Sequence, residues 1–171
     1  QILTRSYLED LLILARASTN TVVFYNSLHA GASVNHIHFH MVSHIARLAI
    51  EDTQIEDAGR YKFLSGYPAC SLVFNMRDPV DEAWLCIDNL QKQGFPFNLI
   101  CIDDRAYLIG RNPEQEVIDE FPGGILASME LAGKLITTER DYYRNAHRDL
   151  VYSALRKSTL DRDVLLRAIT E

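Results

Sequence analysis

The chain of 171 residues has no apolar run near the ~18–20 residues that span a bilayer. Its aliphatic stretch at 11–14 is short and lies between Glu9-Asp10 and Arg16, which is typical of a helix interior rather than a signal peptide. Positive charge is also scarce, because 17 Lys and Arg face 23 Asp and Glu. The net charge of −6 argues against duplex nucleic acid or an acidic membrane as a partner.

Cysteine is rare and has no motif spacing. The three cysteines, Cys70, Cys86 and Cys101, lie far apart, and no Cys-x-x-Cys is present. Such a pattern predicts reduced, mainly structural thiols and a cytoplasmic protein. Hydrophobic residues make up 47% of the chain and charged residues 23%, which excludes disorder as the dominant state. The length fits a single domain over residues 1–171.

Hydrophobic spacing and turn residues predict the order of the elements. Helices are expected at 4–18, 78–92, 125–137, 139–156 and 160–170, and strands at 21–25, 35–42, 61–64, 70–76, 97–102 and 107–111. The polar segment 52–60 is expected to be a mobile connection. The last two strands are expected to form a hairpin across Asp103-Asp104. This order predicts an α+β fold in which helices cover an antiparallel sheet.

The histidines are concentrated in one segment. Five of the six fall between positions 29 and 44, and His36, His38 and His40 alternate with apolar residues. A strand sends alternate side chains to opposite faces, so the three imidazoles are expected to share one face. The apolar face, Ile37, Phe39 and Met41, can then pack on the core. The imidazole face is expected to line a cleft, since unsatisfied polar groups are costly in a core.

Three interpretations of the imidazoles are open. They can be metal ligands, a nucleophile that attacks phosphorus together with its supporting groups, or histidines without chemistry. The preceding loop favours the second interpretation. Gly31, Ala32 and Ser33 are small and can let backbone amides approach a phosphate, while Asn26 and Ser27 stand at the start of the loop. A metal site would need none of these features.

Residues 36–42 resemble the motif of the histidine triad superfamily, His-φ-His-φ-His-φ-φ with φ apolar, at every position. Segments 24–27 and 31–39 are most similar to one branch. It contains galactose-1-phosphate uridylyltransferase, the diadenosine polyphosphate phosphorylases and the GDP-hexose phosphorylases. Segments 96–99, 130–133 and 139–142 resemble the same branch with less specificity. The resemblance implies a histidine triad-like α+β fold.

The resemblance also implies roles for individual residues. His38, the middle histidine, would be the nucleophile that carries the nucleotidyl group, and His36 would orient its ring. His40 takes the third position, where many members of the branch carry Gln, which leaves transfer and hydrolysis both open. The phosphate side would be formed by Asn26, Ser27, Gly31, Ala32 and Ser33. No cofactor and no metal is implied. The substrate would be a nucleotide-sugar or dinucleoside polyphosphate, with inorganic phosphate or a sugar phosphate as acceptor.

Members of the branch are built from two triad-like halves, and this chain corresponds to the C-terminal one. We therefore expect a piece of a longer enzyme, a chain whose site is completed by a partner subunit, or a shortened relative with altered activity. The surface left by the missing half would favour a homo-oligomer. The alternatives are a histidine triad hydrolase and a non-catalytic nucleotide-binding module.

A few further residues are weaker candidates. Loop and surface positions are the more common interpretation for His29, His44 and His147, and solvated charges for Arg111, Lys134 and Glu130.

Overall fold

The computed structural model describes residues 1–43, 46–121, 124–137 and 140–171. Its strands form one antiparallel sheet in the order β2-β1-β6-β7-β5-β4-β3. The strands are β1 (Thr21–Asn26), β2 (His40–Ser43), β3 (Ile55–Ala58), β4 (Tyr61–Leu64), β5 (Leu72–Asn75), β6 (Phe97–Ile102) and β7 (Arg105–Gly110). The helices are α1 (Arg5–Ala17), α2 (Asp81–Lys92), α3 (Ser128–Leu131), α4 (Arg140–Asn145), α5 (Arg148–Ser158) and α6 (Arg162–Thr170). The predicted α+β class with an antiparallel sheet and helical cover is confirmed.

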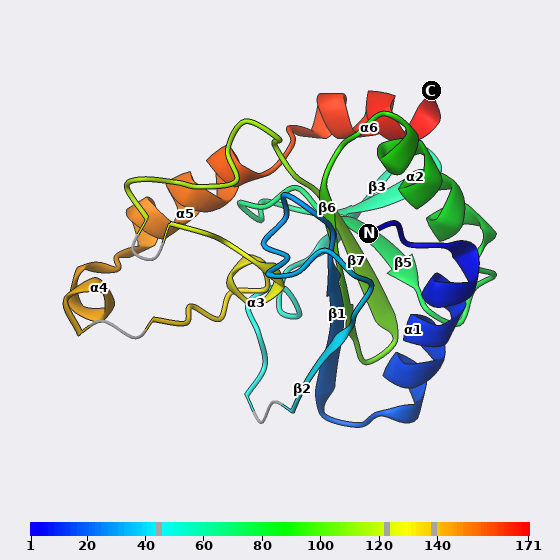
Figure 1. The fold of residues 1–171 in the computed structure, drawn as a ribbon, viewed down its shortest axis with the longest axis horizontal. Coiled ribbons are helices and arrows are strands. Elements are labelled where there is room, and N and C mark those ends of the chain that lie inside the picture. Colours follow the sequence, from blue (N-terminus) through cyan, green and yellow to red (C-terminus); the bar gives the residue numbers. More distant parts are fainter. Residues whose placement is uncertain (44–45, 122–123, 138–139) are drawn as a thin grey trace.

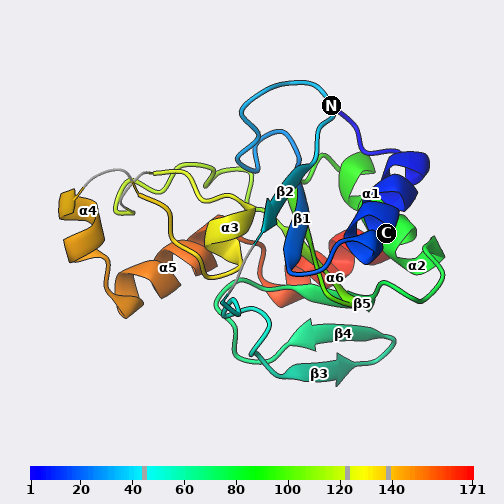
Figure 2. The same cartoon turned by 90° about the horizontal axis from the view of Figure 1, so that it is seen from below.

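Helices cover both faces of the sheet. Figures 1 and 2 show α1, α2 and α6 on one side of the sheet, and α3 and α5 on the other. We call these the α1 face and the α3 face. Alternation along β1 divides the core accordingly, because Val23 and Tyr25 join the cluster on the α1 face while Val22 and Phe24 join the cluster on the α3 face. Short α4 lies at the far end of the molecule from α2 in both views.

The central hairpin of β6 and β7 is the predicted one. Its strands pair from Phe97–Gly110 to Ile102–Arg105, and Asp103 in the connecting turn has φ of 53°. Nearly every residue of both strands is buried, which explains their continuous apolar pattern. The three cysteines are free, and burial raises the pKa of the Cys70 thiol to about 11 and of the Cys86 thiol to about 12.

Several predicted boundaries are wrong. The segment expected to be a mobile connection contains β3, which pairs with β4 from Ile55–Leu64 to Ala58–Tyr61. The helix expected over 125–137 is only the four residues of α3, because Gly133 has φ of 98° and ends it. The long helix expected over 139–156 is divided into α4 and α5. His147 separates them and caps α5, since its Nδ1 accepts from the Leu150 amide at 3.3 Å.

The histidine strand is shorter than predicted. The expected strand over 35–42 begins only at His40, because the ladder with β1 ends at the pair Phe24–His40. Ile37 and Phe39 pack against the core of the α1 face, as the alternation predicts. Met41 does not pack there, since it lies on the edge strand β2 and is 51% exposed. Within the described residues, no helix is long and apolar enough to cross a membrane.

Candidate active site

The three alternating histidines lie side by side. The ring centroids of His36 and His38 are 5.5 Å apart, and those of His38 and His40 are 5.0 Å apart. His36 is exposed, and the other two are half-buried. The row therefore exists although only its last member belongs to a regular strand, and its central ring is accessible.

One hydrogen bond orients the central imidazole. His38 Nδ1 lies 2.9 Å from the backbone oxygen of His36. A carbonyl oxygen only accepts, so Nδ1 of the neutral ring must carry the proton and Nε2 keeps its lone pair. This is the tautomer that a nucleophilic Nε2 requires. The first histidine thus contacts the second through its backbone oxygen.

The third imidazole is held by stacking. The rings of His40 and Phe24 lie nearly parallel, at 11° with centroids 4.8 Å apart. Burial lowers the pKa of His40, and the charge of His38 lowers it further. His40 is therefore neutral at neutral pH, so one of its ring nitrogens is a donor and the other an acceptor.

The predicted phosphate-side residues fall into two groups. Asn26 and Ser27 are buried, and their side chains hold the start of the loop. Ser27 Oγ accepts from the Phe97 amide at 2.8 Å, and Asn26 Oδ1 accepts from Asn98 Nδ2 at 2.7 Å. Ala32 is half-buried and Ser33 is exposed further along the loop. Contact of any of these residues with phosphate stays a prediction.

Gly31 has a steric role that the sequence did not reveal. Its φ is 83°, and a Cβ placed there would come within 2.8 Å of the Ala127 Cβ. The loop thus presses against the segment before α3, where no other residue fits without displacement.

A polar network missed by the sequence reasoning lies behind the loop. Its members are Asn26, Asn98, Arg111 and Ser128, all buried. Arg111 was expected to be a solvated cation, but its side chain is fully buried at the end of β7. Its guanidinium donates to Asn98 Oδ1 at 3.0 Å and to the backbone oxygens of Leu126 and Ser158 at 2.7 and 2.8 Å. The first and last members, Asn26 and Ser128, are 102 positions apart, so the network leaves no local sequence pattern, which is why it was missed.

Other candidates lie elsewhere. His29 is exposed and pairs through Nδ1 with Glu116 at 3.2 Å. Glu130, expected on a helix surface, is buried instead, and its carboxylate accepts from the Ala127 amide at 3.1 Å. Burial raises its pKa. Lys134 is exposed. His44 lies outside the described residues.

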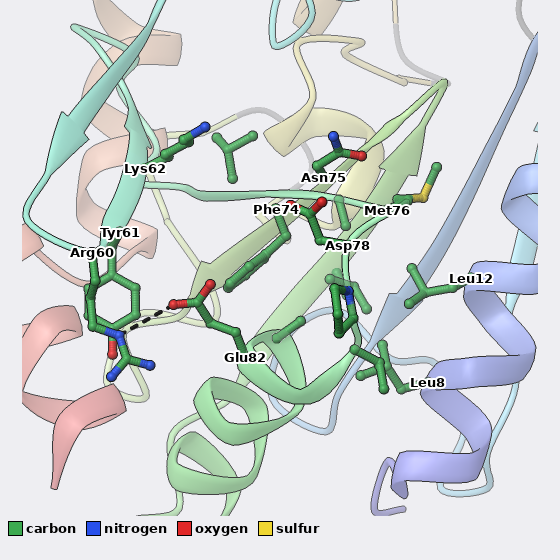
Figure 3. A pocket seen from close by; sticks show the side chains of 16 residues that line it. Leu8, Leu12, Arg60, Tyr61, Lys62, Phe74, Asn75, Met76, Asp78 and Glu82 are labelled. Atoms are coloured by element: carbon green, nitrogen blue, oxygen red, sulfur yellow. Dashed lines mark hydrogen bonds and ion pairs between the residues drawn. The ribbon is translucent and has the colours of Figure 1, made fainter.

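A pocket is present beside α1 and α2 (Figure 3). This pocket of about 100 Å³ is lined by apolar side chains that include Leu8, Leu12 and Leu99, and also by the ion pair of Arg60 and Glu82. These three leucines belong to the core of the α1 face, whereas the imidazoles lie on the α3 face with Phe24. The pocket is therefore separate from the histidine row.

Metal binding gains no support from the arrangement. Across the described ranges, no group of three His, Cys, Asp or Glu side chains is placed to hold a metal ion. The geometry at His38 instead resembles that of a nucleophile with a fixed tautomer.

Comparisons with known proteins agree on the fold. Yeast Ap4A phosphorylase in complex with AMP superposes with a TM-score of 0.71 at 15% identity, over 94% of this chain and 64% of that chain. The chain has the fold of the matched part of that Ap4A phosphorylase. The same enzyme in complex with Ap4A gives a TM-score of 0.63 over the same shares of the two chains.

One sequence relative is consistent with this. GDP-L-galactose phosphorylase 2 of Arabidopsis thaliana is 24% identical over 161 residues, which cover 81% of this chain and 37% of that protein. No model of a known protein family matches. The resemblance to the phosphorylase branch is confirmed, and this chain spans well under two thirds of the sequence relative.

Proposed function

We propose that the chain carries the nucleophile of a nucleotidyl-transferring phosphorylase, which acts on a nucleotide-sugar or a dinucleoside polyphosphate. The observation that carries the proposal is the hydrogen bond from His38 Nδ1 to the His36 carbonyl, in the middle of a row of three imidazoles. It leaves the Nε2 lone pair of His38 available for attack. The known relatives are phosphorylases of these two substrate classes, which supports the choice of reaction.

The reaction has two steps. In the first, the Nε2 lone pair forms a bond to the α-phosphorus of the nucleotide while the bond to the bridging oxygen breaks, and the leaving phosphate takes that electron pair. In the second, an oxygen of inorganic phosphate or of a sugar phosphate attacks the same phosphorus and the N–P bond breaks. His40 is close enough to His38 to donate a hydrogen bond to the transferred group or its leaving oxygen. No metal or cofactor takes part in this scheme.

Trapping the intermediate tests the proposal. The protein is mixed with a GDP-hexose, a UDP-hexose or Ap4A without acceptor, quenched in alkali and weighed by intact-mass spectrometry. We expect an added nucleotidyl mass with one of them, localised to His38 and labile in acid, as phosphorus–nitrogen bonds are. His38→Ala should take up none. His147→Asn, which removes a remote histidine and keeps its capping ability, should label normally.

The outcome of trapping also separates the alternatives. Nucleotide binding without any labelling would indicate a non-catalytic module. Labelling that water discharges as fast as phosphate does would indicate a hydrolase. Self-association and a cytoplasmic location are further parts of the proposal, and light scattering of the purified chain tests the first.

A further inference from the structure

Polar side chains form a line across the sheet that ends beside the histidines. Asn26 of β1 pairs directly with Asn98 of β6, and Arg111 follows β7, the next strand. Asn26 shares a face of β1 with Phe24, whose ring stacks on His40. Continuing the β1–β2 register by two residues beyond Phe24–His40 places Asn26 opposite His38. The rings of Tyr25 and Phe39, 6.2 Å apart on the other face, show that the two segments still run side by side there.

Arg111 fixes the orientation of the Asn98 amide, and through it that of the Asn26 amide. A guanidinium has donors and no acceptor, so the atom of Asn98 that faces it must be the amide oxygen. Asn98 Nδ2 then faces the other way and donates to Asn26 Oδ1 at 2.7 Å and to the Ala30 carbonyl at 2.9 Å. Ser128 Oγ donates to the same Asn26 oxygen. With its oxygen occupied by two donors, the Asn26 amide must turn its NH2 group away from the network.

That NH2 group is free. Among the residues that the structure describes, Asn26 Nδ2 has no hydrogen-bond partner. The unpartnered atoms that are fully enclosed are Gln1 Oε1, Tyr25 OH and Arg111 Nη2. Asn26 Nδ2 is not one of them, so the nitrogen touches solvent, and the 4% exposure of Asn26 accommodates this. Two unused N–H donors on the imidazole face are what an approaching phosphate oxygen needs.

We propose that Arg111 and Asn98 are positioning residues, which lock the Asn26 amide with its NH2 group beside His38, where it donates a hydrogen bond to the phosphate of the nucleotide. The inference rests on the proposed function for the identity of that ligand. The positioning role also explains why Arg111 is buried although it forms no ion pair with any residue that the structure describes. An amide in place of Arg111 would leave either end of Asn98 able to face Asn26, whereas Arg111 permits one direction.

Burial lowers the pKa of Arg111 to about 10, so the guanidinium stays charged at neutral pH. Arg111 therefore orients Asn98 as a charged donor at neutral pH.

The substitution Asn98→Asp tests the direction of the line without removing the network. A carboxylate keeps the shape of the side chain and accepts from Arg111 as a buried ion pair. It has no donor, so Asn26 must turn its NH2 group toward position 98 and its oxygen toward His38. We expect a folded protein with a somewhat lower thermal midpoint, because the Ala30 carbonyl loses its donor, and a loss of kcat/KM of about 100-fold or more, as for removal of an oxyanion donor. Asn75→Asp is the matched control, since Asn75 is exposed and uses its oxygen as acceptor.

A double substitution tests whether the effect passes through Asn26. Asn26→Ala alone should lower kcat/KM by about 10–100-fold, through loss of one donor. If Asn98 acts through Asn26, Asn98→Asp should change kcat/KM less than threefold in the Asn26→Ala background. Multiplicative losses in the double variant, or a folded Asn98→Asp protein with wild-type kcat/KM, would overturn the inference.

A readout that needs no turnover separates this inference from the proposed function. In the full chain, the side-chain amide signals of Asn26, assigned in nuclear magnetic resonance spectra by their loss in Asn26→Ala, should shift on titration with AMP or GMP. They should not shift in this way in Asn98→Asp. Such shifts without any label on His38 would reject the enzyme and keep the lock. Absence of shifts, or labelling of His38 with Asn98→Asp fully active, would reject the lock and keep the enzyme.

Discussion

The two faces of β1 have different roles, although their side chains alternate along the same six residues. Val23 and Tyr25 point to the α1 face, where they are fully buried among helix side chains. Phe24 and Asn26 point to the α3 face, where one supports an imidazole and the other ends a polar network. Side chains on the α1 face therefore serve stability, whereas Phe24 and Asn26 on the α3 face serve the candidate site. Substitutions on the α1 face should leave activity nearly unchanged, and substitutions at the histidines should leave stability nearly unchanged.

The largest expected effect is on the histidine face. His38→Ala should lower turnover by a factor on the order of 10⁴ or more, because it removes the nucleophile of both steps. Stability should change by no more than about 1 kcal/mol, since the side chain is only half-buried and its ring neighbours are the other two histidines. Steady-state kinetics and urea unfolding measure the two quantities. Turnover within a few-fold of wild type would refute the role of His38.

The opposite result is expected on the α1 face. Leu11→Ala removes a fully buried side chain between α1 and the sheet and should lower the free energy of unfolding by about 2–5 kcal/mol. Labelling of His38 below the unfolding transition should persist. Ile13→Ala on the exposed side of the same helix is the control, and should change stability by about 0.5 kcal/mol or less. Equal losses from both variants would contradict the assigned core.

The sequence predicted the features that repeat locally. Apolar spacing located α1 and the central hairpin, because side chains that face one core recur with the period of the element. It failed where tertiary contacts decide. The polar residues of β3 form a strand only because β4 offers a pairing edge, and the helix expected over 125–137 ends early because Gly133 packs against Ala49.

In the candidate site, too, the local pattern was predictable and the long-range contacts were not. Alternation placed the three imidazoles together and Ile37 and Phe39 in the core, and a short motif was sufficient for that. The support behind them was not predictable. Asn98 and Arg111 are ordinary residues of their own segments, and they gain their role only when β6 and β7 pass beside β1. Long-range partners of this kind have no sequence spacing.

A smaller effect is expected where the loop meets the segment before α3. Gly31→Ala has to place a Cβ at 2.8 Å from Ala127 in a backbone with positive φ, and should cost about 1–3 kcal/mol. Gly59→Ala is the matched control, because its φ of 64° is similar and its Cβ would meet nothing within 4 Å. It should cost about 1 kcal/mol. Thermal unfolding of the two variants checks the difference. Equal costs would show that the loop does not press on Ala127.

The smallest expected effect concerns the charge of His40. Phe24→Leu keeps an apolar side chain but removes the stacked ring, so the pKa of His40 should rise toward its ordinary value. In the wild type the folded pKa lies below the unfolded one, so His40 binds its proton more weakly when folded. Its contribution to stability is therefore present above the unfolded pKa and declines as the pH falls below it. Phe24→Leu should reduce this decline.

Titration of the imidazole signals by nuclear magnetic resonance measures the pKa directly, with His147 as an internal reference. A His40 midpoint that does not move in Phe24→Leu would show that the stacked ring is not what lowers the pKa of His40. In that case the neutral state of His40 depends on its neighbour in the row rather than on β1. Phe24 would then support the His40 ring by packing alone, and the charge state of the row would be set by the histidines themselves.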